Sequence, residues 1–150
     1  MTTNKELYIV DDSPDHRFII QNIFSRFLPQ YPVRLFAGGR ELYEFLIVQS
    51  DAHYDGDLPG LILLDLRMPS IKGYDLLKLL RQTPDNNKIH WKTFPIVMMS
   101  SEGSPQEIME CYEAGANSFF KKPTDLDEMR SLMQMICEYW LDFNRLPVMS

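Results

Sequence analysis

Leu61-Ile62-Leu63-Leu64-Asp65 is the most informative segment of this chain for its architecture. Its four aliphatic residues follow one another without a polar interruption, and an acid ends the run. A strand with one solvated face alternates apolar and polar residues, whereas a continuous apolar run is typical of a strand buried on both faces. We therefore expect 61–64 to lie inside a parallel sheet that helices cover on both sides.

Short apolar strands and helical segments alternate on either side of this run. Ser13-Pro14 has the pattern of an N-cap followed by a first-turn proline, and Gly115 is expected at the end of a helix. The other predicted strands are 7–10, 33–36, 95–99 and 118–120. The predicted helices are 14–28, a segment around 42–46, 73–81, 105–114 and a last helix from 124 or 125 to about 140. The polar segments 50–60 and 82–93 are predicted loops.

Five strand–helix units in strict alternation favour an α/β fold, with a parallel sheet and helices on both faces. Ligands of such sheets bind beyond the carboxyl ends of the strands. Several polar residues directly follow predicted strands, and we expect them to gather at one edge: Asp11, Asp12, Asp65, Ser100 and Lys122.

Composition limits the classes of function. The 150 residues include 21 acidic and 15 basic ones, for a net charge of −6, so a basic patch for nucleic acid is not evident. No signal peptide is visible, and the apolar runs fall short of the roughly 20 residues that span a bilayer. We expect one soluble, cytoplasmic domain over residues 1–150 that binds neither nucleic acid nor membrane. Cys111 and Cys137 lack metal-ligand spacing and are predicted to be buried thiols.

The expected edge has a distinct chemistry. Three carboxylates that lie together repel one another, and such a cluster usually persists because a cation binds it. Oxygen ligands favour a hard cation, and Mg²⁺ is the expected one. Mg²⁺ and Lys122 would balance the charges of Asp11, Asp12 and Asp65, which leaves the edge able to receive a phosphoryl group.

These motifs carry a family resemblance. Val10-Asp11-Asp12, Asp65-Leu66-Arg67-Met68-Pro69 with Gly73, Ser100, and Lys122-Pro123 resemble the CheY-like receiver domain of two-component response regulators. The resemblance covers about residues 6–136. It implies a doubly wound, flavodoxin-like (βα)5 fold with a five-stranded parallel sheet in the order 2-1-3-4-5.

The resemblance also implies roles for single residues. Asp65 would be the phosphoacceptor, and Lys122 would pair with the phosphoryl oxygens. Asp12 and Asp65 would bind Mg²⁺ directly, Asp11 through water, and Arg67 through its backbone carbonyl.

Further roles concern the conformational switch. Ser100 would be the switch hydroxyl, and Phe119 stands at the aromatic switch position, where the family often has Tyr. The peptide bond before Pro123 would be cis and would aim Lys122 into the site. Arg67, two residues after the acceptor, is hypothesised to alter the dephosphorylation rate.

The implied function is a signalling switch that accepts a phosphoryl group on Asp65 from a sensor histidine kinase. It is not expected to be an enzyme beyond self-phosphorylation and autodephosphorylation. An alternative is a receiver-like interaction module that does not use phosphorylation. An aspartate-nucleophile hydrolase is disfavoured, because those enzymes need a second acid where this chain has Arg67.

The carboxyl-terminal part suggests how the signal leaves the domain. No output domain is expected, so a downstream protein target or a phosphotransfer protein would receive the signal. The long loop 82–93 and the extended last helix resemble small stand-alone regulators, some of them paired with phytochrome-type histidine kinases.

A homodimer through the last helix and the fifth strand is one hypothesis. Tyr139 is expected to pack on its own sheet, and Trp140 and Phe143 are expected to mark an interface. His90 and Trp91 either contact a kinase or cover an edge of the sheet.

Overall fold

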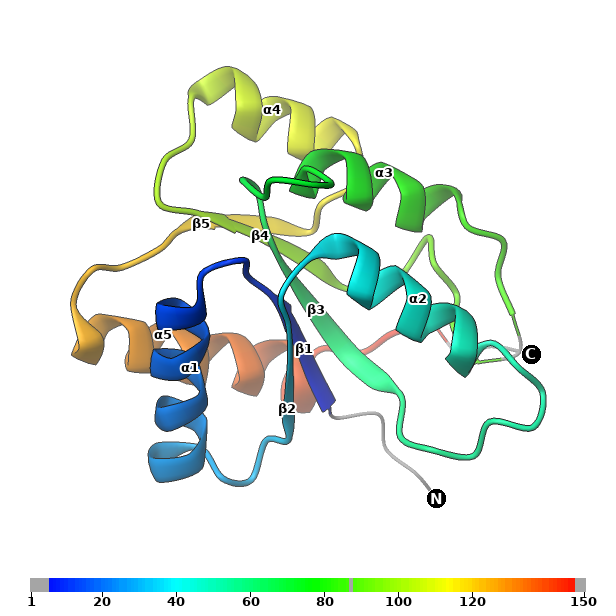
Figure 1. Ribbon diagram of the computed structural model, residues 1–150, viewed down its shortest axis with the longest axis horizontal. Coiled ribbons are helices and arrows are strands. Elements are labelled where there is room, and N and C mark those ends of the chain that lie inside the picture. The colour runs from blue at the N-terminus through cyan, green and yellow to red at the C-terminus, as the bar shows by residue number, and fades with distance from the viewer. Residues whose placement is uncertain (1–5, 87, 148–150) are drawn as a thin grey trace.

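One parallel sheet organises the molecule. The computed structural model describes residues 6–86 and 88–147. The strands pair in the order β2-β1-β3-β4-β5 (Figure 1), which confirms the predicted fold class and strand order. The strands are β1 (Glu6–Val10), β2 (Val33–Phe36), β3 (Pro59–Asp65), β4 (Ile96–Ser100) and β5 (Ser118–Lys121). The α-helices are α1 (Pro14–Phe27), α2 (Gly39–Gln49), α3 (Gly73–Gln82), α4 (Pro105–Glu113) and α5 (Leu126–Cys137).

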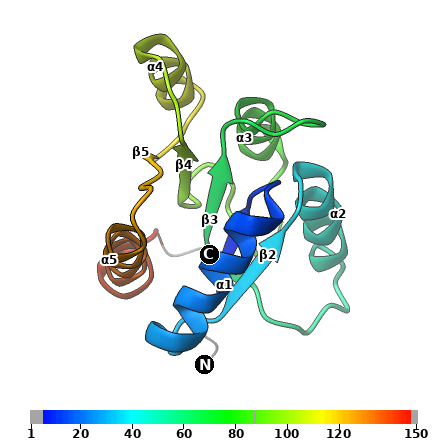
Figure 2. The same cartoon turned by 60° about the vertical axis from the view of Figure 1, so that its left-hand side comes forward.

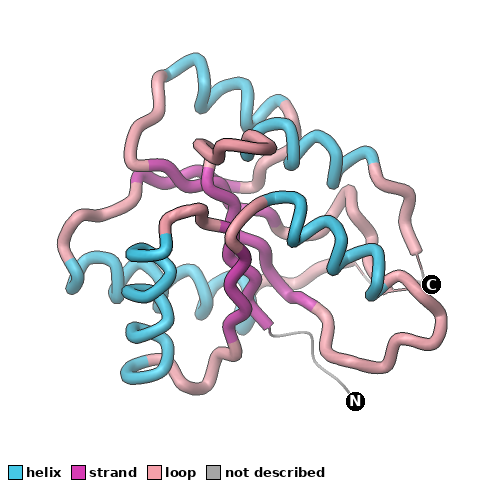
Figure 3. Tube along the Cα trace, viewed as in Figure 1, coloured by secondary structure: helices cyan, strands magenta, loops and turns pink. Residues whose placement is uncertain are grey.

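Strand β3 lies at the centre of the sheet, as its apolar run predicts. Every residue from Pro59 to Asp65 is buried. Leu63 pairs with Ile9 of β1 on one side and with Val97 of β4 on the other. The carboxyl ends of these parallel strands therefore meet at the same edge of the sheet, and the loops that leave them gather there (Figure 3).

Helices cover the sheet in two layers. Helices α2, α3 and α4 lie along one face, and α1 and α5 lie along the other (Figures 1 and 2). Each strand supplies both layers, because successive side chains of a strand point to opposite faces. In β3, Ile62 and Leu64 join the first layer, whereas Leu61 and Leu63 join the second. Two apolar cores therefore hold the strand ends in place.

The helix ends follow the local sequence signals. Ser13 caps α1 by accepting the amide of His16 at 3.3 Å, with Pro14 in the first turn. Ser104 and Glu107 form a reciprocal capping box at the start of α4. Gly115 follows α4 with a φ of +109°, a conformation that a residue without a Cβ adopts at little cost. The predicted caps of α1 and α4 are confirmed.

Several boundaries differ from the sequence prediction by a single residue, as in β4, and two larger differences are informative. Strand β3 begins at Pro59 inside the predicted loop, which is possible because the first residue of a strand need not donate a hydrogen bond. The last α-helix ends at Cys137 and continues as a π-helix over Glu138–Phe143. The amide of Asn144 then donates to the carbonyl of Tyr139 at 2.6 Å. The wider turn rotates the aromatic residues relative to a continuous α-helix, and no sequence signal indicates that change.

The segment between α3 and β4 packs closely on the domain. Trp91 is 2% exposed and stacks at an angle on Phe94, 5.4 Å between ring centroids. Trp91 belongs to the core on the α2, α3 and α4 side of the sheet, so its packing supports a structural role, and neither of the two alternatives is tested directly. His90 is partly exposed, and its Nε2 lies 3.0 Å from Asp85 Oδ2. Among the residues described here, no helix combines the length and the apolar character needed to cross a membrane.

Candidate functional site

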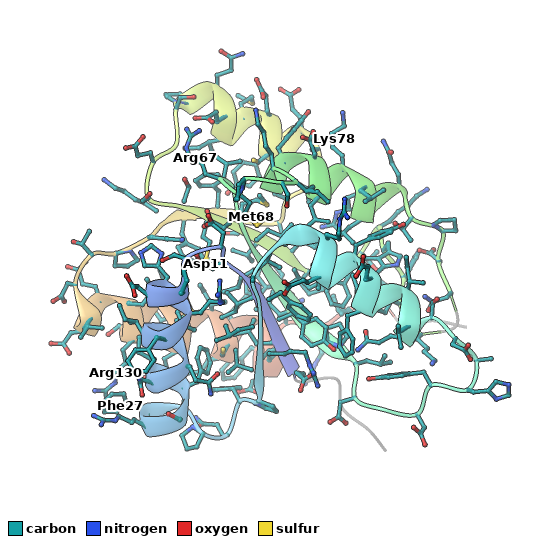
Figure 4. All side chains as sticks on the ribbon, in the orientation of Figure 1. Asp11, Phe27, Arg67, Met68, Lys78 and Arg130 are labelled. Atoms are coloured by element: carbon teal, nitrogen blue, oxygen red, sulfur yellow. The ribbon has the colours of Figure 1, made fainter. Side chains whose placement is uncertain are left out.

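Three residues from three strand ends meet at the carboxyl edge of the sheet. The ammonium group of Lys122 donates to Asp11 Oδ2 at 2.8 Å and to Asp65 Oδ2 at 2.9 Å. Asp11 is fully buried, Asp65 is 5% exposed and Lys122 is 8% exposed. Figure 4 shows Asp11 beside the start of α1. Residues more than fifty positions apart in the sequence thus form one buried charged group.

Neighbouring backbone groups fix both carboxylates. Asp11 Oδ1 accepts a hydrogen bond from the amide of Ser13 at 3.0 Å. The backbone carbonyl of Asp11 accepts one from Arg17 Nη1 at 2.7 Å. Asp65 Oδ1 accepts the amide of Arg67 at 3.2 Å. One oxygen of each carboxylate is therefore occupied by the local turn, and the other faces Lys122.

Asp12 completes an acidic cluster on the solvent side. It is exposed, and oxygen atoms of Asp11, Asp12 and Asp65 all lie within 4.8 Å of one another. Carboxylate oxygens at this spacing are suitable ligands for a hard divalent cation, which also takes water and phosphoryl oxygens as ligands. The predicted convergence of the three acids is confirmed, and the donor set fits a divalent cation.

Burial and pairing act against each other in this group. Burial raises the pKa of the Asp65 carboxyl, and the nearby charge of Asp11 adds to that effect, whereas Lys122 opposes it. For Lys122, burial disfavours the ammonium form, but hydrogen bonds to Asp11 and Asp65 outweigh it and raise its pKa. The ammonium form of Lys122 is therefore favoured, whereas ionisation of Asp65 costs free energy that a bound metal cation would offset.

The loop after β3 is held close to α3. A Cβ added to Gly73 would lie 2.1 Å from the carbonyl oxygen of Asp65, so no side chain fits there. The amide of Gly73 donates to the carbonyl of Leu66 at 3.0 Å. This close approach explains why position 73, four residues after Pro69, is a glycine, and it places the start of α3 next to the backbone of Asp65.

The two predicted switch residues lie where β4 and β5 leave the sheet. Ser100 is 1% exposed, and its Oγ accepts the amide of Glu102 at 3.2 Å. The Phe119 ring packs against the core and reaches below Gly103, where an added Cβ would lie 3.1 Å from its Cζ. Both side chains therefore touch the loop between β4 and α4, and their roles as switches stay predictions.

The expectation of a cis peptide bond before Pro123 is wrong for this structure. No peptide bond within 6–86 and 88–147 is cis, so the Lys122–Pro123 bond is trans. The trans form is the lower in energy for X–Pro bonds by about 0.5–1 kcal/mol. The amide of Lys122 donates to the carbonyl of Ser100 at 2.8 Å, which extends the β4–β5 pairing and brings the ammonium group to the acids without a cis bond.

Two further residues at the site were not expected from the sequence. His16 Nδ1 lies 3.4 Å from both Asp11 Oδ2 and Lys122 Nζ, and its place in the first turn of α1 was the only available signal. Glu107 accepts Arg67 Nη2 at 2.8 Å through Oε1 and at 3.0 Å through Oε2. The capping pattern of Ser104 and Glu107 predicts the helix end, but not the partner from across the site.

The carboxyl-terminal aromatic residues are arranged differently from the prediction. Tyr139, expected to pack, is 53% exposed, whereas Trp140 packs against the core of the α1–α5 layer. Their rings meet edge to face at 4.9 Å. Phe143 is 73% exposed, as expected. The π-helical turn accounts for the exchange, because it changes which side chains face the sheet.

Known response regulators resemble this chain in sequence and in fold. The response regulator Rcp1 of Synechocystis sp. (strain ATCC 27184 / PCC 6803 / Kazusa) is 25% identical over 143 residues, which are 95% of this chain and 93% of Rcp1. A crystal structure of the Mn²⁺-bound form of Rcp1 superposes with a TM-score of 0.73 at 25% identity, covering 96% of this chain and 99% of that one. The phosphorylated cyanobacterial phytochrome response regulator RcpA superposes with a TM-score of 0.80 at 25% identity, covering 97% and 100%.

The family itself follows from a match over most of the chain. Residues 7–134 match the model of the response regulator receiver domain. This range contains all of the acids that meet at the sheet edge, together with Lys122, Ser100 and Phe119. The resemblance inferred from the spaced motifs is therefore confirmed, and the chain belongs to the response regulator receiver domain family.

Proposed function

We propose that this protein is a phosphoryl-accepting switch, with Asp65 as the acceptor. One observation carries the proposal: the buried carboxylate of Asp65 is bonded to Lys122 at 2.9 Å and lies beside the exposed Asp12. A nucleophile is thus oriented at a place that an incoming group can reach from solvent. The family supports a role in two-component signalling.

The proposed reaction is in-line phosphoryl transfer from a phosphohistidine of a sensor kinase. A carboxylate oxygen of Asp65 forms a bond to phosphorus as the phosphorus–nitrogen bond breaks, and the electron pair of that bond stays on the imidazole ring. Such transfers need positioning and charge neutralisation more than covalent help. Lys122, which already contacts Asp65, is placed to pair with an oxygen of the transferred group.

We propose Mg²⁺ as the resident cation. Asp12 and Asp65 would bind it directly and Asp11 through water, and the backbone carbonyl of Arg67 would be a further ligand. When bound, Mg²⁺ supplies positive charge to the phosphoryl oxygens. The residues of the chain orient the acceptor, and the acidic cluster within 4.8 Å supports the cation's place.

Ser100 and Phe119 are the proposed switch. The Ser100 hydroxyl would leave the amide of Glu102 and donate to the phosphoryl group, which changes the position of the loop before α4. The Phe119 ring below Gly103 would then move with that loop. Phenylalanine lacks a hydroxyl, so this movement proceeds without a hydrogen bond from the ring.

The expected partners follow from this chemistry. The donor is a sensor histidine kinase, and the relatives of this chain include a phytochrome response regulator, which favours a phytochrome-type kinase. The protein would act in the cytoplasm, where ATP supplies such kinases. Its signal would pass to a protein target or a phosphotransfer protein by surface contact, and it would hydrolyse only its own phosphoryl group.

One experiment tests the acceptor. The protein is incubated with a small acyl phosphate and Mg²⁺, and its intact mass is followed. We expect one phosphoryl adduct that is absent in Asp65→Asn and in EDTA. Asp75→Asn is the matched control, because Asp75 is an exposed acid of the neighbouring helix α3 and should leave the adduct unchanged. Failure of the wild-type protein to form an adduct would favour the alternative, an interaction module that does not use phosphorylation.

We also propose a homodimer through α5 and β5. Met135, Tyr139 and Phe143 stand four residues apart and are 60%, 53% and 73% exposed, which is unusual for neighbouring large apolar side chains. Strand β5 is an edge strand next to α5. Light scattering of the wild-type protein and of Phe143→Ser, each with and without a phosphoryl mimic, tests this surface. A monomeric mass for the wild type in both states would exclude the dimer.

A further inference from the structure

We propose that Arg67 is a third cation for the phosphoryl group on Asp65, beside Mg²⁺ and Lys122, and that it leaves Glu107 at the start of α4 to bind that group. The inference rests on the proposed function and adds the residue that links the acceptor to α4. It concerns a change of partner by one guanidinium group, so it can fail while Asp65 is still phosphorylated.

The geometry places Arg67 between the acceptor and α4. Its backbone amide donates to Asp65 Oδ1 at 3.2 Å, so the side chain begins next to the acceptor. Its Nη2 ends at Glu107, 2.8 Å from Oε1 and 3.0 Å from Oε2. Figure 4 shows Arg67 on the side of the site toward α4, away from Asp11.

A cavity leaves room for the side chain to turn. Asp12, Arg67 and Glu107 line the same open cavity of about 560 Å³ between the loop after β3, α3 and α4. Asp12 belongs to the acidic cluster around Asp65. Glu107 and the Asp12 side of the acidic cluster therefore border one continuous space, in which the guanidinium group has room to turn.

Charge supplies the reason to move. With the proposed Mg²⁺ bound, the charges of the metal and of Lys122 would balance the three carboxylates of the cluster. Phosphorylation replaces the single charge of the Asp65 carboxylate with the roughly two negative charges of a phosphoryl group. The site then carries about one negative charge more than its cations balance. Arg67 can supply the missing positive charge, because its backbone amide already donates to Asp65.

The ion pair between Arg67 and Glu107 costs little free energy to break. The side chains of Arg67 and Glu107 are 55% and 32% exposed, and exposed pairs of this kind contribute little to stability. A guanidinium group bonds a phosphoryl group through two parallel hydrogen bonds, which are stronger when charged on both sides and partly shielded from water. The phosphoryl group is thus the better partner.

Departure of Arg67 would change how α4 is held. Glu107 Oε1 also accepts the amide of Ser104 at 3.1 Å, and the two residues cap the helix. Without Arg67, the first turn of α4 would keep this local cap but lose its bond to the acceptor loop. The loop between β4 and α4 is bonded to Ser100 through the amide of Glu102, so the contacts of Arg67 with Glu107 and of Ser100 with Glu102 would both be given up in the phosphorylated protein.

A double-mutant cycle tests the exchange on the full chain, with Mg²⁺ and beryllofluoride as the phosphoryl mimic. Calorimetry gives the mimic's dissociation constant for the wild type, Arg67→Ala, Glu107→Gln and the double variant. Gln still supports a capping box but does not form the ion pair. We expect binding about 3- to 10-fold weaker in Arg67→Ala, about 2-fold tighter in Glu107→Gln, and no effect of Glu107→Gln once Arg67 is replaced.

Controls separate the possible outcomes. Arg26→Ala removes an exposed arginine from the last turn of α1 and should leave mimic binding unchanged. Hydrogen exchange of 104–110 should rise with the mimic in the wild type and be high without it in Arg67→Ala. Unchanged binding in Arg67→Ala, or equal effects of Glu107→Gln with and without Arg67, would overturn the inference. No phosphorylation of the wild type on Asp65 would instead overturn the proposed function.

Discussion

The two ends of α4 are each held by an arginine, and the two contacts differ in kind. Arg81, in the last turn of α3, is half-buried and donates to the carbonyls of Gly115 at 2.9 Å and Phe94 at 2.7 Å. It also donates to the carbonyl of Trp91 and to Asn117 Oδ1. Arg67, which precedes α3, is exposed. Within the described residues, its guanidinium group donates only to the two carboxylate oxygens of Glu107.

This difference separates a fixed end from a releasable one. Backbone carbonyls do not change their charge, and they stay where the strands and helix ends place them. The carboxylate of Glu107 lies on an exposed helix turn, and under the proposed function a phosphoryl group on Asp65 would compete with it for Arg67. Helix α4 is therefore attached firmly where it leads into β5 and loosely where it faces Asp65, the proposed acceptor.

Replacement of the fixed contact should have the largest effect. Arg81→Ala would leave several partly buried carbonyls without their charged donor, and we expect a loss of about 3 kcal/mol in the free energy of unfolding. Urea unfolding measures it, with Arg26→Ala as the exposed control. Arg81→Lys should also be destabilised, because an ammonium group cannot reach all of these partners at once. A loss no larger than that of Arg67→Ala would contradict the distinction between the two ends.

Mg²⁺ should raise the free energy of unfolding by binding to the carboxylates around Asp65, the proposed acceptor, on the side of the site that faces the releasable end of α4. Burial raises the pKa of Asp65, so its ionisation costs stability as the pH rises from the unfolded value of 3.8 through the raised folded value. A bound cation offsets that cost. At a concentration ten times its dissociation constant, Mg²⁺ should add about 1.4 kcal/mol near neutral pH and less in acid. Thermal unfolding measures the gain, which Asp12→Ala should remove and Asp55→Asn, an exposed loop acid, should retain.

Arg67→Ala should destabilise the unphosphorylated protein only slightly. The pair with Glu107 is exposed, so the expected loss is about 0.5 kcal/mol. Unfolding in urea, side by side with Arg81→Ala, makes the comparison. A loss as large as that of Arg81→Ala would show that both ends are fixed, and it would remove the reason to expect release.

A fall in pH should weaken the contact between Arg67 and Glu107 at the start of α4 and leave the contacts of Arg81 at its other end unchanged. The amide of Ser104, together with Arg67, holds the pKa of Glu107 below 4.5. A lowered folded pKa contributes stability that is present above pH 4.5 and is lost as the pH falls through the folded value. The stability difference between the wild type and Glu107→Gln should therefore shrink in acid. The difference between the wild type and Arg81→Ala should not follow this course, because Arg81 bonds neutral groups.

The sequence predicts the sheet and the site for identifiable reasons. The apolar run before Asp65 marks the central strand, and the parallel order sends the residues after each strand to one edge. The acids and Lys122 could be named in advance because each directly follows a strand. The peptide bond before Pro123 was expected to be cis from the family resemblance, but a trans bond already brings Lys122 to the acids.

Other features depend on contacts between distant segments. Tyr139 is exposed and Trp140 packs on the core, the reverse of the prediction, because the helix changes its hydrogen-bonding pattern after Cys137. Helix propensity does not indicate such a change. His16 Nδ1 lies 3.4 Å from Lys122 Nζ, a contact between residues 106 positions apart. Trp91 lies in a polar loop by sequence, but it is buried because the loop folds back over the sheet.

By itself, the sequence determined the alternation of strands and helices, the central strand, and the set of charged residues at the carboxyl edge. These follow from local periodicity and from the rule that parallel strands end together. Only the tertiary structure decided that Arg67 and Arg81 bind opposite ends of α4, and that one partner is an exposed carboxylate and the others are carbonyls. Long side chains select their partners by packing and solvent exposure across the fold, which no local pattern encodes.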